Sequence, residues 1–300
     1  ELDDNIYFNQ TRFLILNDTS LDCKGNTLFI NMVKSIKMYG DSILKKCIIE
    51  NTETSIAPLG IAIFSYDAGD ITNTSIIGMP SVDNQTDLIG LKVGFRLYDD
   101  SSATDCKTLA VDEGFFISGN TYLKDCEASF YSYGFVTEND TIIEDSIAWG
   151  SNRTWALERG FSVGDDSKVI NCTSYKNWAR GFSVHQNSSV INCTAINNSN
   201  GFWLWDTSTV KNSISINSNG TGFYLVGAPT VENCQAISSE LGYKLYYDSK
   251  AIDSVSINSD YYGFKAGYNS QIINCSAINT TGYTNESWGY GFILDNQYAP

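Results

Sequence analysis

Carboxylates at regular spacing are the first feature of the chain that could do chemistry. Asp105, Asp125 and Asp145 recur at intervals of 20 residues. Stacked carboxylates repel one another unless they are protonated, separated by water or bridged by a cation. The series predicts either a calcium-bridged ladder or partial protonation, and no other cofactor is expected. Turn chemistry better explains three further acidic pairs, at residues 99–100, 112–113 and 165–166.

The one histidine of the chain, His185, is the next candidate for acid–base or metal chemistry. It occupies a position of the repeat described below at which other repeats carry unrelated residues, namely Tyr98, Ser118, Glu138 and Trp205. A lone histidine at a variable turn position is typical of an exposed surface residue. We therefore expect no catalytic role for it, and the sequence predicts no catalytic residue elsewhere.

A recurring Gly-aromatic pair gives the organisation of the chain. Phe or Tyr follows glycine at intervals of 20 to 28 residues, at Gly94, Gly114, Gly134, Gly160, Gly181, Gly201, Gly222, Gly242, Gly263 and Gly291. Periods of about 20 residues are typical of solenoids. Within each repeat, short β-rich runs are broken by Gly, Asn, Asp and Ser, and no run has helical spacing of apolar residues. The pattern predicts three short strands per repeat.

Aligning the repeats on their glycines places like residues at like positions. The next position is always aromatic, the eleventh is Asp or Asn, and the twelfth is Cys or Ser. Parallel strands place equivalent residues about 4.8 Å apart, so aromatic rings can stack and Asn side chains can bond to their neighbours. The alignment therefore predicts an inward aromatic stack and a polar ladder at the turn.

Six of the eight cysteines lie at the twelfth position, where they alternate with serine. This exchange indicates a small interior side chain, and the lack of Cys-x-x-Cys argues against zinc or redox chemistry. In-register stacking leaves β-carbons farther apart than a disulfide prefers, which favours free thiols. Cys23 and Cys47 are one longer coil apart near the N-terminal end, and they are the only disulfide pair expected.

These ladders resemble the repeats of right-handed parallel β-helices. The stretch GFSVHQNSSVINCTAINNSN at residues 181–200 is similar to repeats of the pectate-lyase-like superfamily, most of all to NosD-like and archaeal surface-protein versions. The resemblance implies one all-β domain over residues 1–300, a right-handed single-stranded parallel β-helix of about a dozen coils of 20–21 residues. It would comprise irregular N-terminal coils at 1–93, regular repeats at 94–292 and an incomplete last coil at 293–300.

The β-helix fold carries unrelated activities, so function depends on the site. Hydrolases of the superfamily combine paired aspartates with Gly-His-Gly and Arg-x-Lys, and the chain has neither triplet. Its lyases use an Arg or Lys base beside calcium carboxylates, and no basic cluster accompanies the acidic pairs. The resemblance therefore implies a protein that is not an enzyme. A polysaccharide lyase or hydrolase, or a glycan-binding module, is the alternative.

Charge and leader signals bear on location. With 34 acidic and 19 basic residues, the net charge of −15 disfavours nucleic acid and anionic lipid surfaces as partners. No apolar run is long enough to cross a bilayer. The chain begins at Glu1 without a leader, which is expected of a processed, secreted protein or of a chain that has been shortened.

Asn-x-Ser/Thr triplets exceed the number that composition predicts, which indicates N-glycosylation in an extracellular chain. Three triplets, at Asn171, Asn192 and Asn274, belong to the Asn-Cys ladder and are set aside. The remaining acceptor candidates are Asn9, Asn17, Asn73, Asn84, Asn139, Asn152, Asn187, Asn197, Asn219, Asn279 and Asn285.

Two over-long coils and the chain ends suggest contacts with other molecules. The extra segments carry aromatic residues that could stack on sugars, contact a protein or cover the flank, namely Trp149, Trp155, Tyr283 and Trp288. Neither end resembles a cap of the strand edges. We therefore expect self-association into an open array, through the ends or lateral faces, of a cell-surface layer, sheath or filament subunit similar to β-solenoid envelope proteins of methanogens. A viral or cell-surface adhesin is a further alternative.

Overall fold

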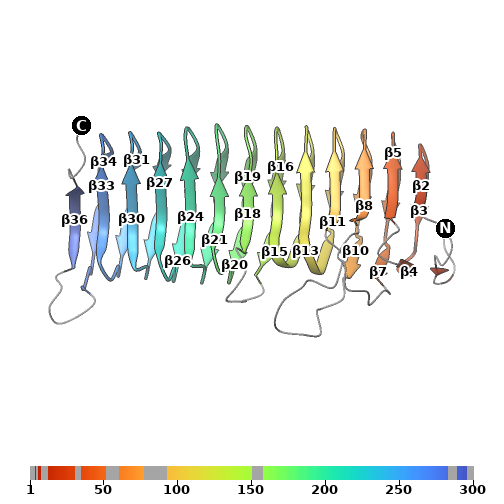
Figure 1. The fold of residues 1–300 in the computed structure, drawn as a ribbon, viewed down its shortest axis with the longest axis horizontal. Coiled ribbons are helices and arrows are strands. Elements are labelled where there is room, and N and C mark those ends of the chain that lie inside the picture. Colours follow the sequence, from red (N-terminus) through yellow and green to blue (C-terminus); the bar gives the residue numbers. More distant parts are fainter. Residues whose placement is uncertain are drawn as a thin grey trace. The chain divides into compact units, whose positions relative to one another are not determined.

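The computed structural model describes residues 4, 6–7, 13–30, 35–51, 61–77, 93–150, 158–282 and 289–295. Every regular element in these ranges is a β-strand, which confirms the all-β prediction (Figure 1). The strands stack in parallel as a solenoid of about 11 turns. Within the described residues there is no helix of the length and hydropathy needed to span a membrane.

The chain divides into two compact units, at Glu1–Ser151 and Asn152–Pro300. Each is described by itself, and the single domain expected over 1–300 stays a prediction. In both units each full turn contributes a strand to three rows. The first row contains the Gly-aromatic pairs, the second follows the Cys/Ser position, and the third lies between them and forms a separate sheet.

The first unit contains strands β1 to β17. Its first row is β2 (Phe13–Asn17), β5 (Ser35–Tyr39), β8 (Ile61–Tyr66), β11 (Val93–Tyr98), β13 (Lys107–Ser118) and β15 (Glu127–Thr137). Its second row is β1 (Ile6–Tyr7), β4 (Thr27–Ile30), β7 (Ile48–Asn51), β10 (Ser75–Ile77) and β17 (Ile147–Trp149), together with the starts of β13 and β15. Its third row is β3 (Ser20–Asp22), β6 (Ile43–Lys45), β9 (Asp70–Thr72), β12 (Ser102–Thr104), β14 (Tyr122–Lys124) and β16 (Ile142–Glu144).

The second unit contains strands β18 to β36. Its first row is β18 (Arg159–Val163), β21 (Arg180–Val184), β24 (Asn200–Trp205), β27 (Thr221–Val226), β30 (Leu241–Tyr246), β33 (Tyr262–Gly267) and β36 (Tyr290–Asp295). Its second row is β20 (Thr173–Tyr175), β23 (Thr194–Ile196), β26 (Ile214–Ile216), β29 (Gln235–Ile237), β32 (Val255–Ile257) and β35 (Ser276–Ile278). Its third row is β19 (Lys168–Ile170), β22 (Ser189–Ile191), β25 (Thr209–Lys211), β28 (Thr230–Glu232), β31 (Lys250–Ile252) and β34 (Gln271–Ile273).

The eleventh position of each repeat lies in a left-handed turn that ends a third-row strand. Asp105 has φ 52° and Asn171 has φ 55°, a region that Asp and Asn adopt more readily than most residues. The asparagines also bond along the ladder: Asn192 Nδ2 donates to Asn171 Oδ1 at 3.3 Å, and Asn233 donates to Asn212 Oδ1 at 2.8 Å. The predicted polar ladder is confirmed.

The core of each unit is a stack of aromatic rings. In the second unit, the ring centroid of Phe202 lies 4.8 Å from that of Phe182 and 4.7 Å from that of Phe223, and all three are fully buried. The neighbouring glycines let the backbones approach, because a β-carbon on Gly222 would lie 2.7 Å from both Ala236 Cβ and the Gly242 carbonyl oxygen. The predicted inward aromatic stack is confirmed.

Cysteine and serine exchange at the twelfth position because they make the same hydrogen bond. Cys126 Sγ donates to the Lys124 carbonyl at 3.2 Å, and Ser146 Oγ donates to the Glu144 carbonyl at 2.7 Å. The six cysteines of this ladder carry free thiols: Cys106, Cys126, Cys172, Cys193, Cys234 and Cys275. Burial raises the pKa of Cys234 to about 12. A buried thiol in that state is a structural side chain rather than a nucleophile.

Cys23 and Cys47 are joined by a disulfide, with 4.9 Å between their α-carbons. The bond closes a loop across a sequence separation of 24 residues. Loop-closure entropy for a loop of that length predicts that replacing both cysteines by serine lowers the free energy of unfolding by about 3 kcal/mol. Denaturant unfolding measures this change. A midpoint equal to that of the unmodified chain would show that the link is not stabilising.

Candidate functional site

The outward side of the first row in the second unit collects aromatic and cationic side chains. Side chains alternate along each strand, so while Phe and Leu point into the core, their neighbours point outward. We call this surface the aromatic-cationic face. It comprises Arg159, Arg180, Ser183, His185, Trp203, Trp205, Tyr224, Lys244, Tyr246, Tyr262 and Lys265. In-register pairing of β18, β21, β24, β27, β30 and β33 brings these residues together.

The cations of this face lie over aromatic rings. The Arg180 guanidinium carbon is 4.0 Å from the Trp203 ring centre, and Lys244 Nζ is 5.0 Å from that of Tyr224 and 5.3 Å from that of Tyr246. Burial, together with the neighbouring Lys265, lowers the pKa of Lys244 from its ordinary value. Cation–π contacts therefore hold positive charge at fixed positions beside flat apolar surfaces. That combination suits a ligand with both sugar rings and negative charge.

His185 lies within this face and is not the exposed turn residue that the sequence predicts. It is half-buried, and its ring stacks on Trp205 with 6.3 Å between centroids and 9° between planes. Its Nε2 lies 3.5 Å from Ser183 Oγ, which accepts a hydrogen bond from Arg180 Nη1 at 3.3 Å. The register places Arg159 beside Arg180 on the adjacent strand. The prediction of an exposed histidine was wrong because the side chains that cover His185 include residues of a neighbouring turn, such as Trp205.

The electrostatic environment keeps His185 neutral. Burial is the largest effect that lowers its pKa from 6.5, and the positive charges of Arg159 and Arg180 lower it further. Asp165 and Asp206 act in the opposite direction, without reversing the shift. A neutral imidazole near two guanidinium groups is a base at neutral pH, and their positive charge would stabilise a negative charge on a ligand.

The titration of His185 gives a direct check of this arrangement. We expect its imidazole to titrate below the ordinary histidine value, and we expect Arg180→Gln to raise its pKa because one positive charge is removed. The chain has a single histidine, so one set of imidazole signals in a nuclear magnetic resonance titration reports on it without assignment. An unchanged pKa in Arg180→Gln would contradict the described geometry.

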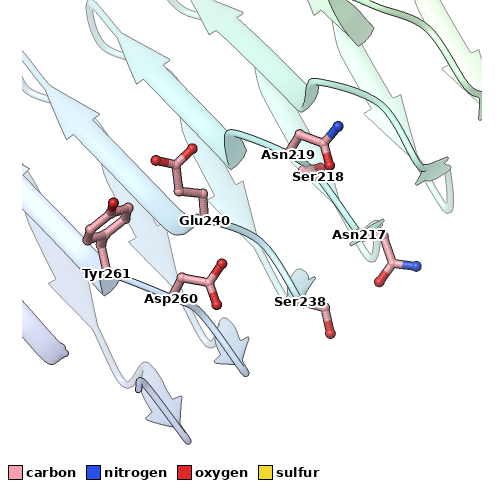
Figure 2. Close-up of a pocket in the computed structure, with 7 residues that line it drawn as sticks. All are labelled: Asn217, Ser218, Asn219, Ser238, Glu240, Asp260 and Tyr261. Carbon is pink, nitrogen blue, oxygen red and sulfur yellow. The ribbon is translucent and has the colours of Figure 1, made fainter. Parts of the chain in front are cut away.

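A polar pocket lies at the turns that precede β27, β30 and β33. It has a volume of about 480 Å³ and is lined by Asn217, Ser218, Asn219, Ser238, Glu240, Asp260 and Tyr261. Figure 2 shows the side chains of Glu240, Asp260 and Tyr261 on neighbouring turns along one edge of this pocket. Its amide, hydroxyl and carboxylate groups match the hydroxyl groups of a sugar. The two carboxylates would repel an acidic group.

The aspartates of the predicted calcium ladder lie in the first unit, in exposed left-handed turns. Lys124 Nζ is 3.8 Å from Asp145 Oδ2, which offsets part of the repulsion among Asp105, Asp125 and Asp145. No group of three or more His, Cys, Asp or Glu in the described ranges is placed to hold a metal ion. Calcium binding therefore stays a prediction from the sequence, without a built site to support it.

The acceptor asparagines in the described ranges are all exposed, namely Asn17, Asn73, Asn139, Asn187, Asn197, Asn219 and Asn279. Several of them have a structural role. Asn217 Nδ2 donates to Asn197 Oδ1 at 3.2 Å, and Asn197 itself has φ 55°. Asparagines with positive φ that are followed by small inward residues recur in the turns. They account for part of the excess of Asn-x-Ser/Thr triplets. Glycosylation stays a prediction, and Asn9, Asn84, Asn152 and Asn285 lie outside the described residues.

Of the aromatic residues predicted for the two over-long coils, one lies within the described residues and three lie outside them. Trp149 ends β17 with an exposed side chain. Trp155, Tyr283 and Trp288 lie outside the described residues. A sugar-binding or protein-binding role for these loops stays a prediction.

Comparison of the structure with solved structures places the fold among the pectate-lyase-like right-handed parallel β-helices. A catalytic domain of a GH87 α-1,3-glucanase in complex with nigerose has a TM-score of 0.69 at 10% identity, covering 93% of this chain and 63% of that one. The periplasmic alginate epimerase AlgG, as a double mutant, has a TM-score of 0.60 at 11% identity, covering 95% and 77%. Pectate lyase Pel9A has a TM-score of 0.51 at 13% identity, covering 86% and 73%.

These comparisons overturn the expectation that the protein is not an enzyme. The three similar structures are a glucanase, an epimerase and a lyase, all enzymes that act on carbohydrates. The chain spans less than two thirds of the length of the glucanase domain, and the identities show the fold alone. No sequence-family model and no curated protein sequence matches the chain. Function therefore rests on the chemistry of the aromatic-cationic face.

Proposed function

We propose that the protein is a carbohydrate-active β-helix protein that binds an acidic polysaccharide on its aromatic-cationic face and removes a proton next to a uronate carboxylate. One observation carries the proposal: His185 stacks on Trp205, and the positive charges of Arg159 and Arg180 help to lower its pKa. The enzyme neighbours support the carbohydrate class. We infer an acidic ligand because the aromatic-cationic face carries several positive charges.

Binding would use the rings as platforms and the cations as carboxylate partners. Trp203 and Tyr224 lie in register on adjacent strands, with 4.1 Å between ring centroids. Flat apolar rings stack on sugar faces, and a guanidinium pairs with a carboxylate through paired donors. The indole Nε1 atoms of Trp203 and Trp205 are buried, so the accessible parts of these side chains offer apolar ring surface to a ligand rather than hydrogen-bond donors.

The chemistry would begin with proton transfer. The unprotonated ring nitrogen of His185 takes the proton from the carbon next to the carboxylate, and the electron pair left behind spreads into the carboxylate. Arg159 and Arg180 stabilise that negative charge. In one outcome the pair expels the glycosidic oxygen at the next carbon and forms a double bond, while the imidazolium protonates the leaving oxygen. In the other the pair takes a proton from water on the opposite face, and the imidazolium proton neutralises the hydroxide that is left, which restores neutral His185. These outcomes are elimination and epimerisation.

A panel of polymers tests the proposal. The purified protein is mixed separately with polygalacturonate, alginate and a neutral α-1,3-glucan, and binding is measured by calorimetry while ultraviolet absorbance follows unsaturated products. We expect binding to a uronan that weakens as salt is added. Arg180→Gln and Lys244→Gln should weaken it, whereas Lys168→Gln, an exposed lysine on β19, should not. If the neutral glucan bound as tightly as the uronans, and none of the variants changed that binding, the proposal would be contradicted.

Extracellular location, glycosylation and self-association remain separate proposals, without an observation in the described residues that favours them. Self-association in particular competes with polysaccharide binding as the role of the exposed faces. Sedimentation of the purified chain, with and without a bound uronan, distinguishes a monomeric binder from an assembling subunit.

A further inference from the structure

The first unit carries a second aromatic surface on the outward side of β5, β8, β11 and β13. Tyr39, Tyr66 and Tyr98 occupy one position on successive turns, and their rings stack with centroids 5.6 and 5.2 Å apart. Two residues earlier on each strand lie Lys37, Phe64 and Arg96, with Phe116 at the same level on β13. We call these seven residues the tyrosine face. All of them are part-exposed.

Arg96 is the charged centre of this surface. Its guanidinium carbon lies 4.5 Å from the Phe116 ring centre and 6.0 Å from that of Phe64. Its Nε is buried and has no hydrogen-bond partner. A guanidinium that lies over aromatic rings keeps its in-plane donors for a planar acceptor such as a carboxylate. Lys37 Nζ adds a second positive charge, 6.0 Å from the centre of the Phe64 ring.

The tyrosine face combines the hydroxyl groups of its tyrosines with the positive charge of Arg96. Burial raises the pKa of Tyr98 from its ordinary value, and the positive charge of Arg96 partly opposes that rise, so the hydroxyl is neutral and able to donate a hydrogen bond. The chain as a whole has a net charge of −15, which makes two cations among five aromatic rings a local exception. Asp67 and Asp99 lie in the turns after the strands rather than on this surface.

We propose that the tyrosine face is a second binding surface for an acidic polysaccharide, separate from the aromatic-cationic face and without a catalytic role. Arg96 binds a uronate carboxylate, and Tyr66 and Tyr98 pack against neighbouring sugar units. The inference rests on the proposed function only for the class of ligand. It makes the chain a protein with two polysaccharide contacts, so a long polymer binds more tightly than a short oligosaccharide through effective concentration.

Long-chain polygalacturonate and alginate are the probes, and affinity electrophoresis measures binding. Tyr66→Ala and Arg96→Gln are each expected to weaken long-chain binding about tenfold. Turnover of short uronate oligosaccharides should stay unchanged. Tyr122→Ala is the matched control, because Tyr122 is a part-exposed tyrosine of the same unit that lies on β14 in the third row and donates to Glu144. Thermal unfolding confirms that each variant is folded.

The outcomes separate this inference from the proposed function. Equal long-chain affinity in Tyr66→Ala, Arg96→Gln and Tyr122→Ala overturns the tyrosine face, and if Trp203→Ala still weakens binding, the proposed function stands. Weaker binding in Tyr66→Ala and Arg96→Gln supports the tyrosine face even where no turnover is found. A chain that binds neither uronan overturns both.

Discussion

Replacing His185 by glutamine is expected to lower turnover of an acidic polysaccharide by about 10²–10⁴-fold, the usual contribution of a positioned general base. Glutamine keeps a polar planar side chain against Trp205 but has no basic nitrogen. The uronan should therefore still bind, since the arginines and aromatic rings remain. Initial rates and calorimetric affinities, measured on the same samples, separate the two effects.

The pH dependence of turnover provides the control for this variant. Because neutral imidazole is the base, activity should rise with pH through the pKa of His185, which burial and the two arginines place below 6.5. Arg180→Gln raises that pKa, so its profile should move to higher pH. Full activity in His185→Gln, or a profile that Arg180→Gln does not move, would remove His185 from the reaction.

Replacing Phe202 by alanine is expected to lower the free energy of unfolding by about 3–5 kcal/mol, the usual cost of truncating a buried aromatic ring. Phe202 is fully buried and stacks on both Phe182 and Phe223. Each turn of a solenoid contacts only its neighbours, so the ring contributes to two interfaces between turns. Denaturant unfolding followed by circular dichroism measures the loss.

Tyr243 provides a matched substitution at the same position of the repeat. Its hydroxyl donates to the Cys234 carbonyl at 2.7 Å, and Tyr243→Phe removes this hydrogen bond while it keeps the stacked ring. We expect a loss of about 1 kcal/mol. If Phe202→Ala cost no more than Tyr243→Phe, the aromatic stack would not be the main source of stability.

Much of the fold follows from the sequence because the repeat constrains each residue type locally. Gly222 is required where a β-carbon would collide with the next turn, and Asn171 is favoured where φ is positive. Phe202 follows its glycine and points inward. Each preference recurs every turn, so alignment of the repeats reveals the ladders without knowledge of the tertiary structure.

The candidate site was harder to predict because it is built from residues that break the repeat. Neighbouring repeats differ at the outward positions of His185, Trp203 and Tyr224. Such variability is typical of a surface without a specific function. One signal was present: Arg-Gly-Phe-Ser-Val occurs at 159–163 and again at 180–184. The repeat places these two arginines in register on adjacent strands, and the second copy is followed directly by the single histidine. Their effect on its pKa depends on burial by adjacent turns, which spacing alone does not provide.

Proton exchange in deuterium oxide shows whether His185 removes the proton next to the carboxylate. The protein is incubated with polygalacturonate or alginate in deuterated buffer, and nuclear magnetic resonance follows the proton on the carbon next to the carboxylate. We expect this signal to be lost with the unmodified chain, by elimination or by deuterium uptake, and to be retained with His185→Gln. If a uronan stays bound to the unmodified chain and keeps this proton, His185 is not the base of a proton-transfer reaction.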